Sequence, residues 1–367
     1  MERNKQLNLH ETIRGVTIGE EFQENNFTDL LDAIVGKMNG DDSLDEKIIF
    51  FNNRARYGQV VFLAGGAGSG KGFASKNFLD VANYKIRDVD EYKLAFQALS
   101  KMERYNNYHV IVSRDPSSKD NPKEISGVQV TKNKPRLDYA GSNTEVYLLG
   151  DLVLKNQDHV GILHLAIKEL GIKNKTLDAL LSQRAGRGKN QLPNIVFDIT
   201  LKDLDDIAEV VPRLIDAGYD TDSIHLVWVL SDFAVAVEQN RNRERVVSSE
   251  IMLKTHVGAA NTMYNIVRSR GVAGLNGGIY VILGGKDHTV FWTDPDGNVI
   301  TNTKGEKLVK GFKSLTLKHE GGSWVGEDRV QQQLYRWMIE SIPNSPKTAG
   351  MWAEISKYLE NSDIQEV

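Results

Sequence analysis

The chain contains no cysteine among its 367 residues, and this absence excludes several kinds of chemistry. Disulfide bonds, cysteine-ligated zinc sites and thiol nucleophiles all require that residue. The absence of cysteine is compatible with a reducing compartment but does not establish one. Any catalysis must therefore use other side chains.

Long apolar runs are also absent. No uninterrupted apolar stretch approaches the roughly 20 residues that span a bilayer. The first residues, MERNKQLNLHETIRG, lack the apolar segment of a secretory signal. We therefore expect a cytoplasmic protein without a membrane partner.

The chain has little net charge. Its formal charge is −4, so nucleic-acid binding would require a local basic patch. Hydrophobic residues make up 40% and charged residues 26%, as in a globular protein of two or three domains. The local basic candidates are Lys119–Lys134 and Arg184–Lys189, and the second of these also fits a helix end with solvated cations.

The most informative stretch that is present is Gln59–Ser75, QVVFLAGGAGSGKGFAS. Its apolar opening, Val60–Ala64, predicts a buried parallel strand. The glycines that follow predict a phosphate-binding loop leading into a helix, because they let successive N–H groups turn towards phosphate oxygens. Lys71 would place an ammonium on the β- and γ-phosphates. The predicted nucleotide-binding residues are Gly65, Gly66, Ala67, Gly68, Ser69, Gly70, Lys71 and Gly72.

This loop departs from the usual nucleotide-binding pattern at one position. The match to G-x-x-x-x-G-K-[ST] runs from Gly65 to Lys71, and Gly72 then replaces the hydroxyl that usually contacts magnesium. A G-K-G ending resembles that of nucleoside-monophosphate kinases such as adenylate kinase. The pattern therefore favours a kinase, and the alternative is a glycine-rich turn with a chance lysine.

Asp90 follows a predicted strand at Tyr84–Val89 and precedes a predicted helix at Glu91–Glu103. Ligands of open α/β sheets bind at the carboxyl ends of strands. A carboxylate there can orient an acceptor hydroxyl and accept its proton. The alternative is that Asp88 or Asp90 caps the helix.

Asp198 lies near the end of a third predicted strand, Pro193–Thr200. An acid in this position holds Mg²⁺, directly or through water, in many nucleotide-binding proteins. The alternative is a cap on a helix predicted at Leu201–Ala217.

Arg241 and Arg245 fall on a helix predicted at Phe233–Val246, after a fourth strand at Ser223–Leu230. Their spacing of four residues places both guanidinium groups on one helix face, where they could clamp phosphate oxygens. Surface ion pairs with nearby glutamates are the alternative. A lid-like stretch is predicted at Val247–Gly258, and its His256 is interpreted as structural.

The predicted fold is α/β, with a five-stranded, mainly parallel sheet whose fifth strand is Gly278–Gly284. The predicted domains are an N-terminal extension at 1–57, a core at 58–284 with an insert at 104–192, a small antiparallel β unit at 285–327 and helices at 328–367. The insert is too long for a simple loop.

Taken together, these segments resemble the zeta-toxin family of P-loop kinases. GGAGSGKG at Gly65–Gly72 resembles the nucleotide loop of that family, and RDVDEYK at Arg87–Lys93 resembles its D-x-D-x-[FY]-[KR] segment. NIVFDITLKD at Asn194–Asp203 resembles its acid-bearing strand and turn. The segment with Arg241 and Arg245 resembles its phosphate-contacting arginines.

The resemblance implies ATP as donor, Mg²⁺ as cofactor and Asp90 as the residue that activates the acceptor hydroxyl. Family members phosphorylate UDP-N-acetyl sugars, and similar phage chains include kinases of hydroxymethylated DNA bases, which would act in the host cytoplasm. Gly72, Asp198 in place of a frequent glutamate, and the unmatched insert are departures from the family pattern. The acceptor, small molecule or DNA, stays open, as do the oligomeric state and any antitoxin partner. A non-catalytic ATP-binding regulatory protein is the rival function.

Overall fold

The computed structural model describes the chain between residues 57 and 363, apart from short stretches. Residues outside the described part are 1–56, 80–83, 104–105, 116–123, 134–142, 183–191, 242–245, 285–287, 304, 306, 326 and 364–367. The predicted N-terminal extension, Arg245 and the basic stretch 184–189 therefore fall outside the described residues.

The chain divides into two compact units. One, which we call the insert unit, is built mainly on Asp88–Gln183. The other, the core unit, contains Asn39–Arg87, Arg184–Arg243 and Val247–Val367. The insert was predicted to begin at residue 104, whereas the insert unit already includes the helix that contains Asp90.

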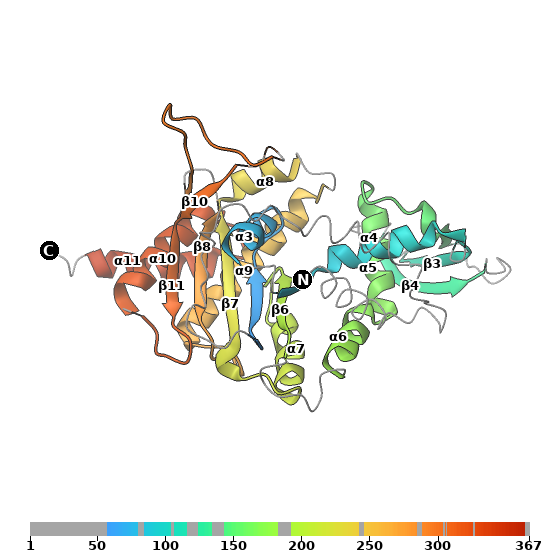
Figure 1. The fold of residues 1–367 in the computed structure, drawn as a ribbon, viewed down its shortest axis with the longest axis horizontal. Helices are drawn as coiled ribbons and strands as arrows, with labels where there is room; N and C mark the ends of the chain where they lie inside the picture. Colours follow the sequence, from blue (N-terminus) through green and yellow to red (C-terminus); the bar gives the residue numbers. More distant parts are fainter. Residues whose placement is uncertain are drawn as a thin grey trace. The chain divides into compact units, whose positions relative to one another are not determined.

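The core unit is organised around one six-stranded sheet, in the order β11-β8-β7-β1-β6-β2 (Figure 1). Five of these strands are parallel neighbours, and β11 pairs antiparallel with β8. The strand bounds are β1 Val60–Ala64, β2 Tyr84–Arg87, β6 Asn194–Ile199, β7 Ile224–Ser231, β8 Ile279–Gly284 and β11 Ser314–Lys318. The predicted five strands of a mainly parallel sheet are confirmed, and β11 is an addition to them.

Continuous apolar sequence explains the centre of this sheet. Every residue of β1 and β7 is buried, as expected for parallel strands covered on both faces. Phe62 of β1 stacks on Phe197 of β6 with ring centroids 5.1 Å apart. The centre of the sheet is therefore a rigid platform for the loop that follows β1.

Six α-helices of the described part belong to the core unit. Their bounds are α3 Lys71–Phe78, α7 Asp205–Asp216, α8 Phe233–Arg241, α9 Ser249–Ser269, α10 Glu327–Ser341 and α11 Ala349–Asp363. Asp232 caps α8 by accepting from the N–H groups of Ala234 and Val235, at 2.7 and 3.2 Å.

Most of the predicted lid-like stretch, Val247–Gly258, belongs to the first half of α9, which begins at Ser249. Ser248 caps the helix by accepting from the Ile251 N–H at 3.3 Å. Gly258, the last residue of that stretch, lies inside the helix. A Cβ at Gly258 would stand 2.8 Å from the Lys202 backbone, so the glycine serves close packing there.

The predicted small β unit is only partly present. Strands β9 (Thr289–Phe291) and β10 (Val309–Phe312) form a two-stranded antiparallel sheet. Val299 and Thr301, which also lie in the predicted unit, form only isolated bridges. Strand β11 lies within the predicted range 285–327 but pairs with the main sheet, where Leu317 is buried.

The insert unit is an α/β unit with its own core. Its three-stranded antiparallel sheet has the order β4-β3-β5. The element bounds are α4 Val89–Ser100, β3 Tyr108–Arg114, β4 Ile125–Lys132, β5 Thr144–Leu148, α5 Gln157–Glu169 and α6 Ile172–Ser182. Phe96 of α4 packs in the same apolar cluster as Val110, Val112, Ile162 and Leu163, which explains why α4 belongs to this unit.

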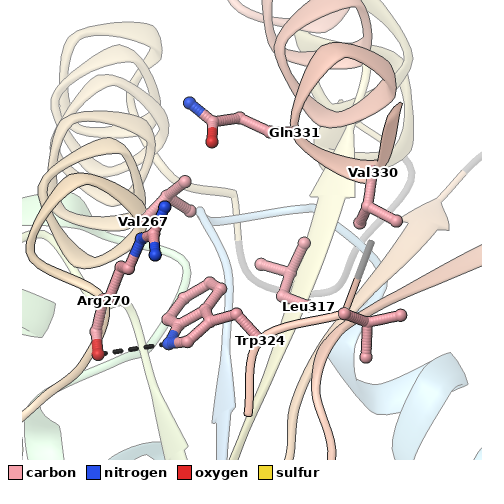
Figure 2. Close-up of a pocket in the computed structure, with 7 residues that line it drawn as sticks. Val267, Arg270, Leu317, Trp324, Val330 and Gln331 are labelled. Atoms are coloured by element: carbon pink, nitrogen blue, oxygen red, sulfur yellow. Dashed lines mark hydrogen bonds between the residues drawn. The ribbon is translucent and has the colours of Figure 1, made fainter. Parts of the chain in front are cut away.

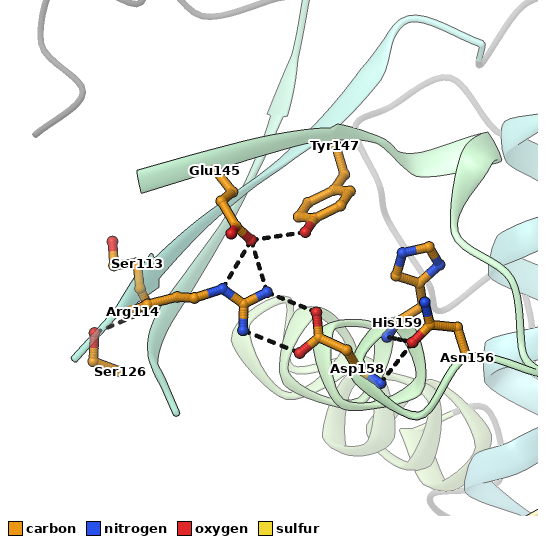
Figure 3. Close-up of polar contacts among 8 residues, drawn as sticks. All are labelled: Ser113, Arg114, Ser126, Glu145, Tyr147, Asn156, Asp158 and His159. Carbon is orange, nitrogen blue, oxygen red and sulfur yellow. Dashed lines mark hydrogen bonds and ion pairs between the residues drawn. The ribbon is translucent and has the colours of Figure 1, made fainter. Parts of the chain in front are cut away.

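An ion-pair cluster joins the sheet of the insert unit to α5 (Figure 3). Arg114 donates to Asp158 at 3.0 and 2.6 Å and to Glu145 at 2.8 Å. Tyr147 donates to the same Glu145 at 2.7 Å. These contacts lower the pKa of Glu145, chiefly through the bond from Arg114. The cluster fixes β3, β5 and α5 to one another.

No helix in the described part of the chain is both long enough and apolar enough to cross a membrane.

Candidate active site

The predicted phosphate-binding loop, Gly65–Gly72, lies between β1 and α3, and we call it the glycine loop. Gly68 and Gly70 have φ values of 77° and 90°, which side chains other than glycine rarely adopt. Gly70 is the residue before α3, so the first N–H groups of that helix face the end of the loop. This strand–loop–helix geometry is suited to anion binding.

Lys71 and Asp198 lie together at this loop. The Lys71 ammonium is 3.6 Å from Asp198 Oδ1, and it also donates to the carbonyl oxygen of Gly65 at 2.8 Å. A weaker bond reaches the Gly66 carbonyl at 3.4 Å. Asp198 comes from β6, in register with Leu63 of the adjacent β1. The two side chains are 13% and 23% exposed, so both are partly shielded yet reachable by a ligand.

Ser69 contributes a buried hydroxyl to the loop. The residue is 2% exposed, and its Oγ has no hydrogen-bond partner among the described residues. A Cβ added to Gly65 would lie 2.5 Å from this Oγ and 3.3 Å from Lys71 Cγ. An orphaned polar atom beside the lysine fits a site that a polar ligand completes.

The loop is held from one side by two adjacent residues of α9. Thr255 Oγ1 accepts from the Ala67 N–H at 3.1 Å. His256 Nε2 bonds to the Ala67 carbonyl oxygen at 2.8 Å. Ala67 therefore uses both of its backbone polar groups to anchor the loop. These two side chains were missed as site residues, because they lie about 190 positions away in sequence.

Asp90 lies in the first turn of α4, in the insert unit. Its backbone N–H donates to Asp88 Oδ1 at 2.8 Å, so Asp88 makes the cap-like contact that was one alternative for this pair. The Asp90 carboxylate instead pairs with the nearly buried Lys93 at 3.0 Å. The Asp90 side chain is 40% exposed.

The predicted arginine pair is only partly described. Helix α8 is described from Phe233 to Arg241, and the next four residues lie outside the described part, so the expectation that both arginines share one helix face stays a prediction. Arg245 lies outside the described residues, and Arg241 is exposed at the helix end. Asn240, one position earlier, bonds to both backbone groups of Val247 at 2.7 and 3.0 Å. That pair of bonds holds the end of α8 beside the start of α9.

Asp198 is the carboxylate beside Lys71 that could hold a magnesium ion. Gly72 and Phe73 offer no hydroxyl, and no group of three or more metal-ligating side chains occurs in the described residues. Mg²⁺ with nucleotides commonly needs only one or two carboxylates, with phosphates and waters as the other ligands. Asp198 fits that requirement.

A pocket elsewhere in the core unit does not involve the glycine loop (Figure 2). It lies at the far end of α9, where Trp324 Nε1 donates to the Arg270 carbonyl oxygen at 3.1 Å. Its lining residues are Val267, Arg270, Leu317, Trp324, Val325, Val330 and Gln331.

Comparison with known proteins gives no matching family model and no matching curated protein. Among solved structures, a native AvrRxo1-ORF1:-ORF2 complex matches at 12% identity over 82% of this chain and 75% of that chain, with a TM-score of 0.35. The PezAT chromosomal toxin–antitoxin system of Streptococcus pneumoniae matches at 12% identity, over 93% and 97%, with a TM-score of 0.34. AvrRxo1-ORF1:-ORF2 with ATP matches at 9% identity, over 97% and 85%, with a TM-score of 0.36. Such low scores assign neither an activity nor a substrate to this chain.

Proposed function

We propose that this protein is an ATP-dependent kinase that transfers the γ-phosphate to a hydroxyl group of an acceptor. The observation that carries the proposal is the Lys71–Asp198 pair at the glycine loop, with its ammonium 3.6 Å from the carboxylate. A lysine and an acid beside a strand–loop–helix turn are the parts that phosphoryl transfer needs on the donor side.

Lys71 and the loop N–H groups bind the donor phosphates in this proposal. The ammonium already lies against the Gly65 carbonyl, so it needs only to exchange that partner for phosphate oxygens. Asp198 would hold Mg²⁺, which would supply positive charge to neutralise the donor phosphates. The absence of a hydroxyl at Gly72 leaves Asp198 as the protein ligand that the loop region supplies.

Asp90 acts on the acceptor side as general base. Its pairing with Lys93 orients the carboxylate, which in this proposal accepts the proton of the acceptor hydroxyl. Arg241 and Arg245 are proposed to spread the charge that develops on the transferred group. Because phosphoryl transfer depends mainly on positioning and electrostatics, this short set of residues is chemically sufficient.

The acceptor is a nucleotide sugar, a nucleotide or a hydroxymethylated DNA base. No contact in the described residues favours one of these classes over the others. DNA binding would use a basic surface, and its affinity would fall steeply with salt.

The test is incubation of the protein with γ-labelled ATP, Mg²⁺ and each of the three acceptor classes. We expect label to move to one class, and Lys71→Ala and Asp90→Asn each to reduce transfer by about a thousandfold or more. Thermal melting checks that both variants are folded. Asp203→Asn, an exposed acid after β6, is the matched control and should transfer normally.

Two outcomes would contradict the proposal. Full transfer by Asp90→Asn on the true acceptor would remove the base assignment. Tight ATP binding without transfer to any acceptor class would favour the rival function, a nucleotide-binding regulatory protein.

A further inference from the structure

Thr255 and His256 make an unusual pair of contacts with a single residue of the glycine loop. Thr255 accepts the Ala67 N–H and His256 bonds to the Ala67 carbonyl oxygen, at 3.1 and 2.8 Å. Both side chains come from consecutive positions of α9, and both residues are buried, at 8% and 2% exposure. The backbone on either side of Ala67 is therefore fixed by one rigid element.

The Thr255 hydroxyl is the acceptor in its hydrogen bond with the Ala67 N–H. The same hydroxyl donates to the Met252 carbonyl oxygen, one turn earlier in α9, at 2.9 Å. Because the hydroxyl has a single hydrogen, it can only accept from Ala67. The Ala67 N–H is thereby used within the protein.

The bond from His256 to the Ala67 carbonyl oxygen fixes the orientation of the peptide group between Ala67 and Gly68. In a trans peptide the carbonyl and the following N–H point in opposite directions. When His256 holds the Ala67 carbonyl, the Gly68 N–H must point away from α9. Gly68 has φ 77° and starts the part of the loop that leads to Lys71.

Packing leaves His256 little freedom to move. Its ring lies edge-on to Phe233, with centroids 5.4 Å apart. A Cβ at Gly66 would lie 2.2 Å from His256 Cδ2, so the ring fills the space that a side chain at Gly66 would need. Burial lowers the pKa of His256, and the nearby positive charge of Lys71 acts in the same direction. Because a carbonyl oxygen can only accept, the ring hydrogen in the bond to Ala67 lies on Nε2.

We propose that Thr255 and His256 are positioning residues for nucleotide binding, because together they hold the Ala67 backbone so that the Gly68 N–H faces the phosphates. This inference rests on the proposed function, because it assumes that the glycine loop binds ATP. Neither side chain touches the nucleotide. Each acts through the loop backbone.

The test uses the full-length chain and two pairs of variants. Thr255→Val removes the hydroxyl and keeps the shape, while Thr255→Ser keeps the hydroxyl. His256→Leu removes the donor, while the amide nitrogen of His256→Gln reaches the position of Nε2. Thr262→Val is the matched control, because Thr262 lies two turns further along the same helix with the same 8% exposure.

Two quantities are measured for each variant. The first is the dissociation constant of Mg-ATP by calorimetry, and the second is the hydrogen-exchange rate of the Ala67 and Gly68 amides. We expect Thr255→Val and His256→Leu to weaken ATP binding by about tenfold or more. Exchange at Ala67 should accelerate in Thr255→Val. Thr255→Ser, His256→Gln and Thr262→Val should stay within about threefold of the unmodified protein.

Wild-type ATP affinity in both Thr255→Val and His256→Leu would overturn the inference, even if their melting temperatures fall. If His256→Leu does not fold, the milder Thr255→Val decides. If the unmodified protein fails to bind ATP, the proposed function is wrong. The exchange of Ala67 still tests the anchor in that case, and equal rates in the unmodified protein and Thr255→Val would overturn it.

Discussion

His225 shows how a single buried polar residue can hold the end of the sheet opposite the glycine loop. Its Nδ1 accepts from the Gly278 N–H at 2.9 Å. A backbone N–H can only donate, so the ring hydrogen must be on Nε2, which donates to Gln59 Oε1 at 2.8 Å. The residue is completely buried, so water cannot replace either partner.

We predict that His225→Leu lowers the free energy of unfolding by about 2–4 kcal/mol, because two buried groups lose their partners while the volume is roughly kept. Urea denaturation measures this change. The control is His319→Leu, which changes an exposed histidine and should alter stability by no more than about 0.5 kcal/mol. Equal stabilities for the two variants would show that these hydrogen bonds contribute little.

The residues of the site divide into those that local sequence reveals and those that it hides. Lys71 and Asp198 each belong to a local pattern, a glycine loop and a strand end, and parallel pairing of β1 with β6 brings them together. Thr255 and His256 belong to no such pattern. Their role depends on where α9 packs, which hydrophobic spacing alone does not specify.

Asn240 acts at the scale of elements, because it ties α8 to α9. Its side chain bonds to both backbone groups of Val247, and the residue is 3% exposed. The segment between these two residues contains Arg241 and Arg245. If the arginines act on phosphate, their action therefore depends on the Asn240–Val247 bonds that fix the two ends of this segment.

We predict that Asn240→Ala lowers the free energy of unfolding by about 1–3 kcal/mol, because the Val247 groups lose their partner. If the arginines stabilise the transition state, kcat should also fall by about tenfold, with a smaller change in the KM for ATP. Steady-state kinetics and thermal melting measure both effects. Gln239→Ala, on the exposed face of α8, is the control. An unchanged kcat together with lower stability would exclude the arginines from catalysis.

The boundaries of elements could be predicted from the sequence where the apolar pattern was unbroken. Their prediction failed where a glycine or a polar residue had a packing role. Four of the five parallel strands have buried, apolar centres, whereas β2 (YKIR) does not, and all five were predicted. Gly258 interrupted the pattern of α9 because the Lys202 backbone approaches it closely, which is a tertiary cause. Strands β3 and β4 of the insert unit are half-buried and bordered by polar residues, so their pattern was weaker.

The division into two units is the feature of the whole molecule with the clearest consequence for function. The glycine loop, Asp198 and α9 all belong to the core unit, whereas Asp90 belongs to the insert unit. The insert unit has its own apolar cluster, which includes Phe96, Val110 and Ile162. The residues that we propose for the donor side and for the acceptor side therefore belong to different compact units of the chain.

We expect that shortening the chain separates ATP binding from phosphate transfer to the acceptor. We predict that replacing residues 88–182 with a Gly/Ser linker leaves Mg-ATP affinity within about threefold and abolishes transfer to the acceptor. Strands β2 and β6 are parallel neighbours at the edge of the sheet, so the linker must cross back along it. About a dozen residues suffice for such a connection, and residues 183–193 are retained as part of it.

Circular dichroism and urea unfolding of the shortened chain establish that the core unit is folded, and calorimetry with Mg-ATP then measures donor binding. Lys71→Ala in the same shortened chain is the control that ties any binding to the glycine loop. A folded core that no longer binds ATP would mean that the insert unit supplies part of the donor site. Transfer that persists without residues 88–182 would show that Asp90 is dispensable and that the base must be sought in the core unit.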